Sequence, residues 1–170
     1  MRYFLSLGSN VGDRMKNLNE ALFLLKNEAV ELVKASSVYE TQPIGIISNL
    51  WFFNQVIEVE ADFSPRAFLA VIKTIEKRMG REVSIRNAPR IIDIDILLAG
   101  KTVINTKEIA IPHPRMVKRN FVLIPLKEIS PDTVHPLLKE SIFKLWQKCK
   151  DISLVNKIMG ADCLKSKKET

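Results

Sequence analysis

Two aspartates in the middle of the chain are the residues best suited to chemistry. Asp93 and Asp95 alternate with isoleucines in the stretch RIIDIDIL, which begins at Arg90. In a strand, residues two apart project to the same face, so both carboxylates are expected on one face, with Ile94 opposite them in the core. Adjacent carboxylates repel unless a cation lies between them, and Mg²⁺ prefers such oxygen ligands together with water and phosphate oxygens. The spacing therefore predicts a Mg²⁺ site on this strand, and an ordinary solvated polar face is the alternative.

Three arginines precede the aspartates or begin the same strand, namely Arg81, Arg86 and Arg90. A guanidinium presents a planar fork to phosphate oxygens, and arginines beside paired carboxylates are typical of phosphoryl-transfer sites. The sequence contains no Gly-x-x-x-x-Gly-Lys-Ser/Thr loop, which excludes a P-loop enzyme. We therefore expect a phosphoryl-transfer site of another kind, with a solvated basic loop as the alternative.

A histidine and an asparagine are further candidates. His113 stands between two prolines and precedes Arg115 and Arg119, so it could contact a phosphate or donate a proton. Asn54 lies beside two phenylalanines, and an amide next to aromatic rings suits the edge of a flat heterocycle. Taken alone, Asn54 is more typical of a hydrogen-bonded strand asparagine beside core phenylalanines.

The composition limits the class of protein. The chain has 170 residues, a formal net charge of +7 and 46% hydrophobic residues, which suits one folded domain rather than disorder. We expect a single domain over residues 1–160 and a flexible basic tail over 161–170 that carries part of the charge. No apolar run is long enough to span a membrane, and two isolated cysteines, Cys149 and Cys163, indicate a reducing cytoplasm. The charge is compatible with nucleic acid, an anionic membrane surface or a small polyanion such as a nucleotide.

Hydrophobic periodicity and turn signals predict the elements that must position these residues. We expect strands at 3–6, 29–39, 51–59, 90–98 and 102–105, helices at 14–27, 64–80, 117–126 and 142–150, and turns or loops at 8–14 and 81–89. Asp13 and Ser64 are the expected N-caps of the first two helices. The order β-α-β-β-α-β predicts a split βαβ arrangement of the α+β class, an antiparallel sheet with helices on one face.

Six short motifs follow one another along the chain. They are LGSN at 7–10, YET at 39–41, FNQV at 53–56, GR at 80–81, PRIIDIDIL at 89–97 and IPHPRM at 111–116. In this order they resemble the 6-hydroxymethyl-7,8-dihydropterin pyrophosphokinase family of folate biosynthesis, over about residues 3–132. The resemblance implies a ferredoxin-like α+β sandwich with added C-terminal helices. It also implies an ATP-dependent enzyme that transfers the terminal diphosphate to the hydroxymethyl group of the dihydropterin and releases AMP.

The resemblance further implies a role for each site residue. The catalytic group would be Arg81, Arg90, Asp93 and Asp95, of which the two aspartates would hold two Mg²⁺ ions. ATP would be bound by Lys73, Glu76, Arg81, Arg86, Arg90, Ile96, His113, Arg115 and Arg119. The pterin would be bound by Thr41, Pro43, Ile44, Gly45, Phe52, Asn54 and Phe121, with the two phenylalanines on either side of its ring.

Two other functions compete with this assignment. An RNA-binding module of the same fold class would suit the basic charge, but the Lys/Arg-Gly-Phe/Tyr pattern of its sheet is absent from the sequence. A non-catalytic relative would suit the segment RNAPR at 86–90, where the family often has Trp in place of Asn87. Retention of Asp93, Asp95 and His113 argues against that relative. We therefore expect small-molecule partners, ATP and the dihydropterin, with no nucleic acid and no membrane. We also expect a cytoplasmic monomer that makes at most weak contact with neighbouring folate-pathway enzymes.

Overall fold

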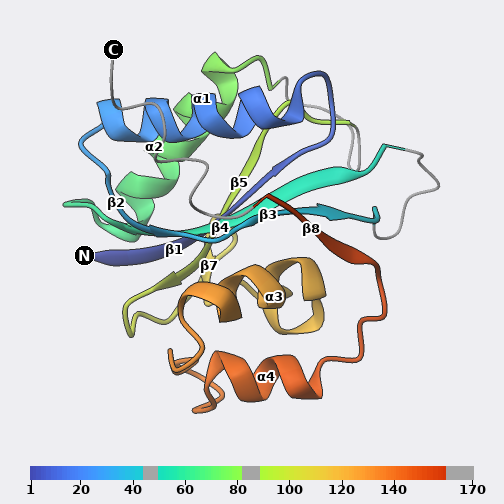
Figure 1. Cartoon of the computed structure of the whole chain (residues 1–170). Coiled ribbons are helices and arrows are strands. Elements are labelled where there is room, and N and C mark those ends of the chain that lie inside the picture. The colour runs from blue at the N-terminus through green and yellow to red at the C-terminus, as the bar shows by residue number, and fades with distance from the viewer. Residues whose placement is uncertain (44–49, 82–88, 160–170) are drawn as a thin grey trace.

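The computed structural model describes residues 1–43, 50–81 and 89–159, and its centre is an antiparallel sheet of six strands (Figure 1). These strands are β1 (Arg2–Ser9), β2 (Glu31–Ala35), β3 (Val38–Thr41), β4 (Phe52–Glu60), β5 (Asp93–Ala99) and β8 (Val155–Met159). In the sheet β5, β1, β4, β3 and β8 follow one another, and β2 also pairs with β4. Two short strands, β6 (Ile104–Asn105) and β7 (Ala110–Ile111), pair apart from it. The helices are α1 (Arg14–Asn27), α2 (Pro65–Arg78), α3 (Asn120–Ile129) and α4 (Ile142–Lys148), with a 3₁₀ turn at Met116–Lys118.

The sheet order confirms the predicted fold class. The first elements follow as β-α-β-β-α-β, with the second strand divided into β2 and β3, and β1 and β4 lie in the middle of the sheet. This is the split βαβ, or ferredoxin-like, arrangement. α1 and α2 cover one face, whereas α3 and α4 lie against the other (Figure 1). The two helices of the β-α-β-β-α-β unit share one face as predicted, and the added C-terminal helices, for which no position was predicted, cover the opposite face.

Local chemistry explains where the first two helices begin. The Asp13 side chain accepts a hydrogen bond from the Lys16 amide at 3.0 Å, and Ser64 caps α2 in the same way. Pro65 occupies the first position of α2, where its missing N–H costs nothing. Gly12, just before the α1 cap, has a φ of +64°, a left-handed conformation that glycine adopts without strain. Both predicted caps are confirmed.

Side-chain alternation builds a core on each face of the sheet. Leu7 and Ile94 point toward the first two helices and pack in one buried cluster with Phe68 of α2. Val56 points the other way and packs with Leu123 of α3. The central strands are thus buried from both sides, which fixes their register, since a one-residue slip would exchange the two sets of side chains.

Three strand predictions differ from the structure. Residues 29–39 form two strands, because the chain changes course at Ser36 and Ser37 between β2 and β3. Ser36 is buried there, and its amide and hydroxyl both bond the main chain of Val56. The strand expected at 102–105 is shorter and belongs to the separate hairpin of β6 and β7. β8, near the end of the chain, was not predicted at all.

Some predicted features lie outside the described residues. These are Ile44 and Gly45, Arg86, Cys163 and the basic tail at 161–170. Cys149 is described and packs against the cluster beneath α3 and α4. Across residues 1–43, 50–81 and 89–159, no helix combines the length and apolar character needed to cross a membrane.

A carboxylate on α3 ties the added helices to the sheet. Glu128 accepts hydrogen bonds from the Ser37 amide at 2.9 Å, the Ser37 hydroxyl at 2.6 Å, the Tyr39 hydroxyl at 2.9 Å and the Lys157 ammonium at 3.2 Å. Burial alone would raise the pKa of Glu128, but the bonds from Ser37, Tyr39 and Lys157 outweigh it and hold that pKa below its usual value. One side chain therefore links α3 to β3 and β8.

We predict that Glu128→Gln lowers the free energy of unfolding by about 2 kcal/mol at neutral pH, because charge-assisted bonds are lost. A carboxylate whose folded pKa is depressed stabilises the protein above its unfolded pKa and loses that effect as the pH falls. The difference between wild type and variant should therefore shrink below about pH 4. Urea denaturation at several pH values measures it.

Glu140→Gln is the control, since within the described residues the Glu140 side chain has one ion-pair partner, the exposed ammonium of Lys148. It should cost less than about 1 kcal/mol. Equal losses in the two variants, or a difference that does not change with pH, would contradict the role given to Glu128.

Candidate functional site

One face of the sheet carries a small pocket where β5, β1, β4 and β3 lie side by side. Its cavity is about 120 Å³. The residues that line it are Ser6, Gly8, Thr41, Gln42, Pro43, Phe52, Asn54, Arg90, Asp93, Asp95, Arg119 and Phe121. The pocket therefore brings together both predicted metal ligands and five residues predicted to bind the pterin.

Strand register explains why these residues meet. Gly8 of β1 lies opposite Asp93 of β5 on one side and opposite Asn54 of β4 on the other. Two residues earlier on β1, Ser6 lies opposite Asp95. Cross-strand neighbours share a face, so the carboxylates, the glycine and the asparagine form one continuous surface. The isoleucines between the carboxylates point into the core, as predicted.

Gly8 is a site residue that the sequence prediction missed, because the glycine was assigned to a turn whereas it lies inside β1. A Cβ at this position would stand 2.8 Å from the Asn54 side-chain oxygen and 3.7 Å from the Phe52 ring. Real Cβ contacts are essentially never that short, so only glycine leaves the floor of the pocket open here. A glycine within an alternating strand was the available signal.

Asn54 is fixed within the pocket. Its side-chain amide donates a hydrogen bond of 2.6 Å to the Thr41 hydroxyl, and both residues are buried. Phe52 begins the same strand and pairs with Thr41, whereas Phe121 reaches the pocket from α3. The pocket is therefore lined by an oriented amide and by two partly buried phenylalanines that come from different layers of the fold.

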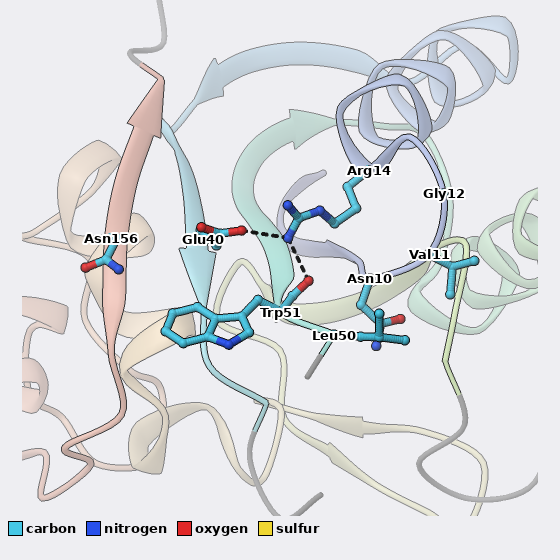
Figure 2. Close-up of a pocket in the computed structure, with 8 residues that line it drawn as sticks. All are labelled: Asn10, Val11, Gly12, Arg14, Glu40, Leu50, Trp51 and Asn156. Carbon is cyan, nitrogen blue, oxygen red and sulfur yellow. Dashed lines mark hydrogen bonds and ion pairs between the residues drawn. The ribbon is translucent and has the colours of Figure 1, made fainter. Parts of the chain in front are cut away.

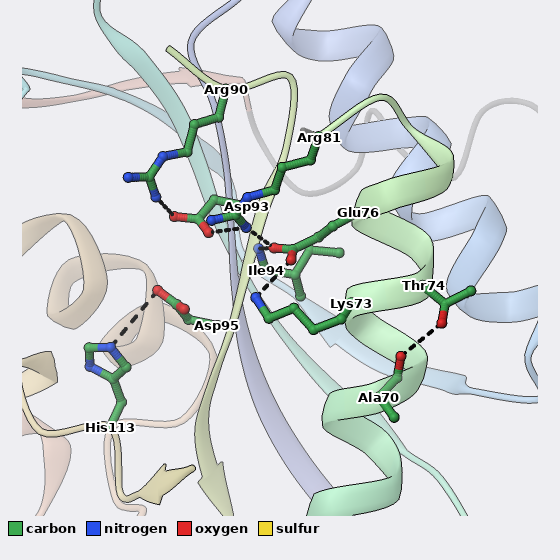
Figure 3. A network of polar contacts seen from close by, with 10 residues as sticks. All are labelled: Ala70, Lys73, Thr74, Glu76, Arg81, Arg90, Asp93, Ile94, Asp95 and His113. Atoms are coloured by element: carbon green, nitrogen blue, oxygen red, sulfur yellow. Dashed lines mark hydrogen bonds and ion pairs between the residues drawn. The ribbon is translucent and has the colours of Figure 1, made fainter. Parts of the chain in front are cut away.

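The two aspartates stand in different electrostatic states (Figure 3). Asp93 accepts hydrogen bonds from Arg81 at 2.6 Å and from Arg90 at 2.5 Å, one on each carboxylate oxygen. Asp95 lines the pocket with 42% of its side-chain surface exposed, enough for an ion or ligand to reach its oxygens. Desolvation by the surrounding protein, and after it the neighbouring charge of Asp93, raise the pKa of Asp95 to about 6.

Glu76 holds one of these arginines in place (Figure 3). The carboxylate is buried on α2 and is bonded by Arg81, by Lys73 at 2.7 Å and by the main-chain amide of Ile94 at 2.8 Å. It therefore fixes both the guanidinium and the strand that carries the aspartates. Glu76 and Lys73 were expected near the nucleotide, and in the structure Glu76 already has three protein donors.

Asn10 holds the main chain of Arg90, and it is a second residue for which no role was predicted. Its main-chain amide donates to the carbonyl oxygen of Arg90 at 3.1 Å, and its side-chain oxygen accepts from the Arg90 amide at 2.7 Å. These two bonds join the end of β1 to the start of the aspartate strand. An asparagine in a turn-rich segment was the available signal, and the structure shows that it is buried.

His113 lies beside the aspartates as a neutral group. Burial, and after it the charges of Arg119 and Arg115, lower the pKa of His113 to about 4. Its Nδ1 accepts the Arg115 amide at 3.2 Å, so the proton of the neutral ring belongs on Nε2. Nε2 lies 3.9 Å from an Asp95 oxygen, beyond hydrogen-bond range. His113 can thus offer an N–H to a ligand but carries no spare proton at neutral pH.

The remaining predicted site residues differ in their relation to the pocket. Arg119 lines it, whereas Arg115 is exposed at the start of the 3₁₀ turn. The Ile96 side chain lies in the core on the other face of β5, so only its main chain could reach a ligand. Ile44, Gly45 and Arg86 lie outside the described residues. Their roles stay predictions.

The donor set suits a hard cation that brings other ligands with it. Within the described parts of the chain, no group of three or more His, Cys, Asp or Glu residues gathers to hold a metal ion. Asp93 and Asp95 offer carboxylate oxygens only, which matches an ion that takes water and phosphate oxygens for the rest of its shell. A cation beside Asp95 would stabilise the ionised carboxylate and so lower its raised pKa.

A larger cavity lies elsewhere and holds neither aspartate. It measures about 630 Å³ and lies beside Arg14, Glu40 and Trp51 (Figure 2). Size alone would select it as the ligand site. The chemistry selects the smaller pocket, because the carboxylates, the arginines and the bonded asparagine converge there.

Comparisons with known proteins agree with this choice. Residues 4–131 match the model of the family 7,8-dihydro-6-hydroxymethylpterin-pyrophosphokinase (HPPK). A 2-amino-4-hydroxy-6-hydroxymethyldihydropteridine pyrophosphokinase of Bacillus subtilis is 42% identical over 127 residues, which are 74% of this chain and 76% of that protein. The folic acid synthesis protein fol1 of Pneumocystis carinii is 38% identical over 148 residues, which are 87% of this chain but only 20% of that longer protein. A crystal structure of Plasmodium falciparum HPPK-DHPS A437G with SDX-DHP superposes with a TM-score of 0.73 at 20% identity, over 86% of this chain and 45% of that one, and shows the same fold.

We predict that Asp95→Asn makes the ligand-free protein more stable at about pH 7.5. A carboxyl group whose folded pKa is raised stabilises the protein below its unfolded pKa and loses that effect as the pH rises through about 6. The neutral amide avoids the loss, so the gain should vanish toward about pH 4. Urea unfolding at the two pH values measures it, and added Mg²⁺ should stabilise wild type more than the variant.

Asp62→Asn, at an exposed position outside the pocket, is the control and should change stability equally little at both pH values. An Asp95→Asn variant that is no more stable than wild type at the higher pH would contradict the raised pKa. Equal stabilisation of both proteins by Mg²⁺ would remove Asp95 from the metal site.

Proposed function

The chain belongs to the 7,8-dihydro-6-hydroxymethylpterin-pyrophosphokinase family of folate biosynthesis, and we propose that it transfers the terminal diphosphate of ATP to the hydroxymethyl oxygen of the dihydropterin. In this reaction the oxygen attacks the β-phosphorus, the bond from that phosphorus to the α,β-bridging oxygen breaks, and AMP leaves. The observation that carries the proposal is the single pocket in which Asp93 and Asp95 adjoin Asn54 and two phenylalanines. Such a pocket serves a planar ring and a polyphosphate together.

The asparagine end of the pocket suits the pterin. The Asn54 side-chain oxygen faces the space above Gly8, and its amide is already fixed by Thr41. An amide held in this way offers its oxygen to the N–H groups of a heterocycle edge. Phe52 and Phe121 then supply ring faces for stacking. This arrangement directs the hydroxymethyl arm toward the aspartates.

The arginine end suits the phosphates. In the structure Arg81 and Arg90 both donate hydrogen bonds to Asp93, and Arg119 lines the same pocket. We propose that the two arginines exchange Asp93 for phosphate oxygens when ATP binds, which frees the carboxylate. Glu76 holds the Arg81 guanidinium and Asn10 holds the Arg90 main chain, so both positive charges are already in place for the charge that develops in transfer.

Asp93 and Asp95 would then hold Mg²⁺, and we propose two ions shared between them. When bound, Mg²⁺ neutralises phosphate oxygens and makes a coordinated hydroxyl easier to deprotonate. Among the described residues in and beside the pocket, His113 is neutral with its Nδ1 already bonded, Asp93 is paired with arginines, and Asp95 would be occupied as a metal ligand. The contribution of the protein is therefore position and charge rather than covalent chemistry.

We also propose that the protein works as a cytoplasmic monomer on these two small molecules. ATP supply favours the cytoplasm, and the paired carboxylates, which repel phosphate without a metal ion, argue against nucleic acid as a ligand. Light scattering should give the chain mass of 19.4 kDa. A doubled mass, or RNA binding in the absence of Mg²⁺, would contradict this part of the proposal.

The direct test is incubation with ATP, Mg²⁺ and 6-hydroxymethyl-7,8-dihydropterin, followed by chromatography for AMP. We predict that Asp93→Ala and Asp95→Ala each lower AMP formation at least about a thousandfold, because each removes a carboxylate from the centre of charge. Both variants should stay folded by circular dichroism. ADP in place of AMP would indicate a simple kinase, and normal turnover by either variant would contradict the metal assignment.

The control is Asp132→Ala, which removes an exposed carboxylate outside the pocket and should keep full activity. A loss as large as that of the Asp95 variant would mean that the effect is not local.

A second prediction concerns the pocket floor. Gly8→Ala should raise KM for the pterin about tenfold. The new methyl carbon would lie 2.8 Å from the Asn54 side-chain oxygen, so that oxygen must move. KM for ATP should change less than about twofold. Steady-state kinetics with each substrate varied in turn measures both. An unchanged pterin KM would show that Asn54 does not read the pterin edge.

Gly100→Ala is the comparison variant. Gly100, unlike Gly8, has a positive φ, +53°, and an added Cβ there meets no atom within 4 Å and lies away from the pocket. It should lower stability through backbone strain without changing either KM.

A further inference from the structure

We propose that Arg14 is a positioning residue for the pterin end of the pocket, acting from the opposite face of the sheet. This inference rests on the proposed function. Arg14 is the first residue of α1, and its guanidinium donates hydrogen bonds of 2.8 Å to a Glu40 carboxylate oxygen and 2.8 Å to the Trp51 carbonyl oxygen (Figure 2). The same guanidinium lies 3.8 Å from the centre of the Phe53 ring. One side chain thus joins α1 to the end of β3 and the start of β4.

The contacts of Arg14 and the residues of the pocket alternate along the same two strands. On β3, Glu40 bonds Arg14 and the next residue, Thr41, lines the pocket. On β4, Phe53 stacks under the guanidinium, and the residues on either side of it line the pocket. Glu40 and Phe53 are also direct cross-strand partners. Successive residues of a strand point to opposite faces of the sheet. Arg14 therefore holds the residues on one face, and their neighbours on the other face would contact the pterin ring.

The position of Arg14 is not explained by helix formation. A cation at the first position of a helix stands near the positive end of the helix dipole, where acidic residues are favoured. The side chain therefore stays there against a local preference and gains its interactions from the sheet. Arg14 and Glu40 are only 26% and 29% exposed, so their pair is less screened by solvent than a surface pair.

The hydrogen bonds of Arg14 connect two strand ends, which are here called stems: the end of β3 and the start of β4. Glu40 and Thr41 end β3, and Trp51 and Phe52 stand where β4 begins, at the two ends of the connecting segment. Arg14 holds a side chain on one stem and a carbonyl oxygen on the other, so it sets the distance between them. Loss of the guanidinium should let Thr41 and Phe52 move apart on the front face. It should leave Asp93 and Asp95, which are on a different strand, unaffected.

The experiment separates the two ends of the pocket. Binding of 6-hydroxymethyl-7,8-dihydropterin is measured by calorimetry in the presence of Mg²⁺ and α,β-methylene ATP, an analogue that cannot transfer its diphosphate because the bond to be broken is replaced. Binding of the analogue is measured separately. We expect Arg14→Met to raise the pterin Kd about tenfold and to change the analogue Kd less than about twofold.

Two further variants test whether the ion pair carries the effect. Arg14→Lys keeps the charge near Glu40 and over the ring, so it should recover part of the lost affinity. Glu40→Gln should weaken pterin binding by itself but add little to Arg14→Met in the double variant, because both remove the same interaction. Arg66→Met is the matched control: Arg66 pairs with Glu108 at 3.7 Å with both side chains about 70% exposed, and its loss should leave both Kd values unchanged.

Three outcomes would overturn the inference. The first is an unchanged pterin Kd in Arg14→Met and Glu40→Gln, measured beside a wild-type protein that binds. The second is equal weakening of both ligands with a lowered melting temperature, which would mean general destabilisation. The third is failure of the wild type to bind the pterin, which would reject the proposed function and this inference together. If Arg14→Met does not fold, Glu40→Gln and Arg14→Lys decide the question alone.

Discussion

The hydrogen-bond register between β5, β1 and β4 is the constraint on which the site depends. It aligns Asp93, Gly8 and Asn54 in one row across three strands. A carboxylate, the glycine at the bottom of the pocket and a side-chain amide therefore become neighbours. A slip of one residue would place Ile94 in the pocket and a carboxylate in the core, at a cost of several kcal/mol. Both faces of these strands are packed, which is why the register has no easy alternative.

Charge within the pocket follows from that alignment. Two carboxylates share one face, and the protein balances them unequally: Asp93 receives two guanidinium groups, whereas Asp95 is left with a raised pKa. The arrangement is incomplete without a cation and an anion, which is what a metal-bound nucleotide provides. The net charge of +7 could have indicated any polyanion. Three arginines placed beside two aspartates favour a phosphate compound with a divalent ion over nucleic acid.

The parts of the fold that could be predicted from sequence are those set by local chemistry. α1 was predicted at its observed bounds because a cap and a 3.6-residue period define it, and the aspartate strand because alternation is strict there. The split of residues 29–39 could not be predicted, since it depends on bonds from Ser36 to a strand about twenty residues away. β8 was missed for the same reason: its pairing with β3 is a contact between distant parts of the chain. The family and the pyrophosphokinase function were predicted from motifs and are confirmed by the comparisons.

The site shows the same division between residues that carry chemistry and residues that hold them. Asp93 and Asn54 could be named as candidate site residues from their type and sequence neighbours. The roles of Gly8, Asn10 and Arg14 depend on residues from other elements and could not be predicted in this way. A strand presents alternate residues to its two faces, so a pocket on one face leaves every second residue free to be held from behind. Arg14 contacts β3 and β4 behind Thr41 and Phe52, and Glu76 holds β5 between the two aspartates through the amide of Ile94. In both cases a buried or half-buried ionic group on a helix determines the position of a strand, and the strand determines the position of the ligand-facing side chain. Part of the geometry of a small, solvent-open pocket can therefore be set by contacts on the opposite face of the sheet.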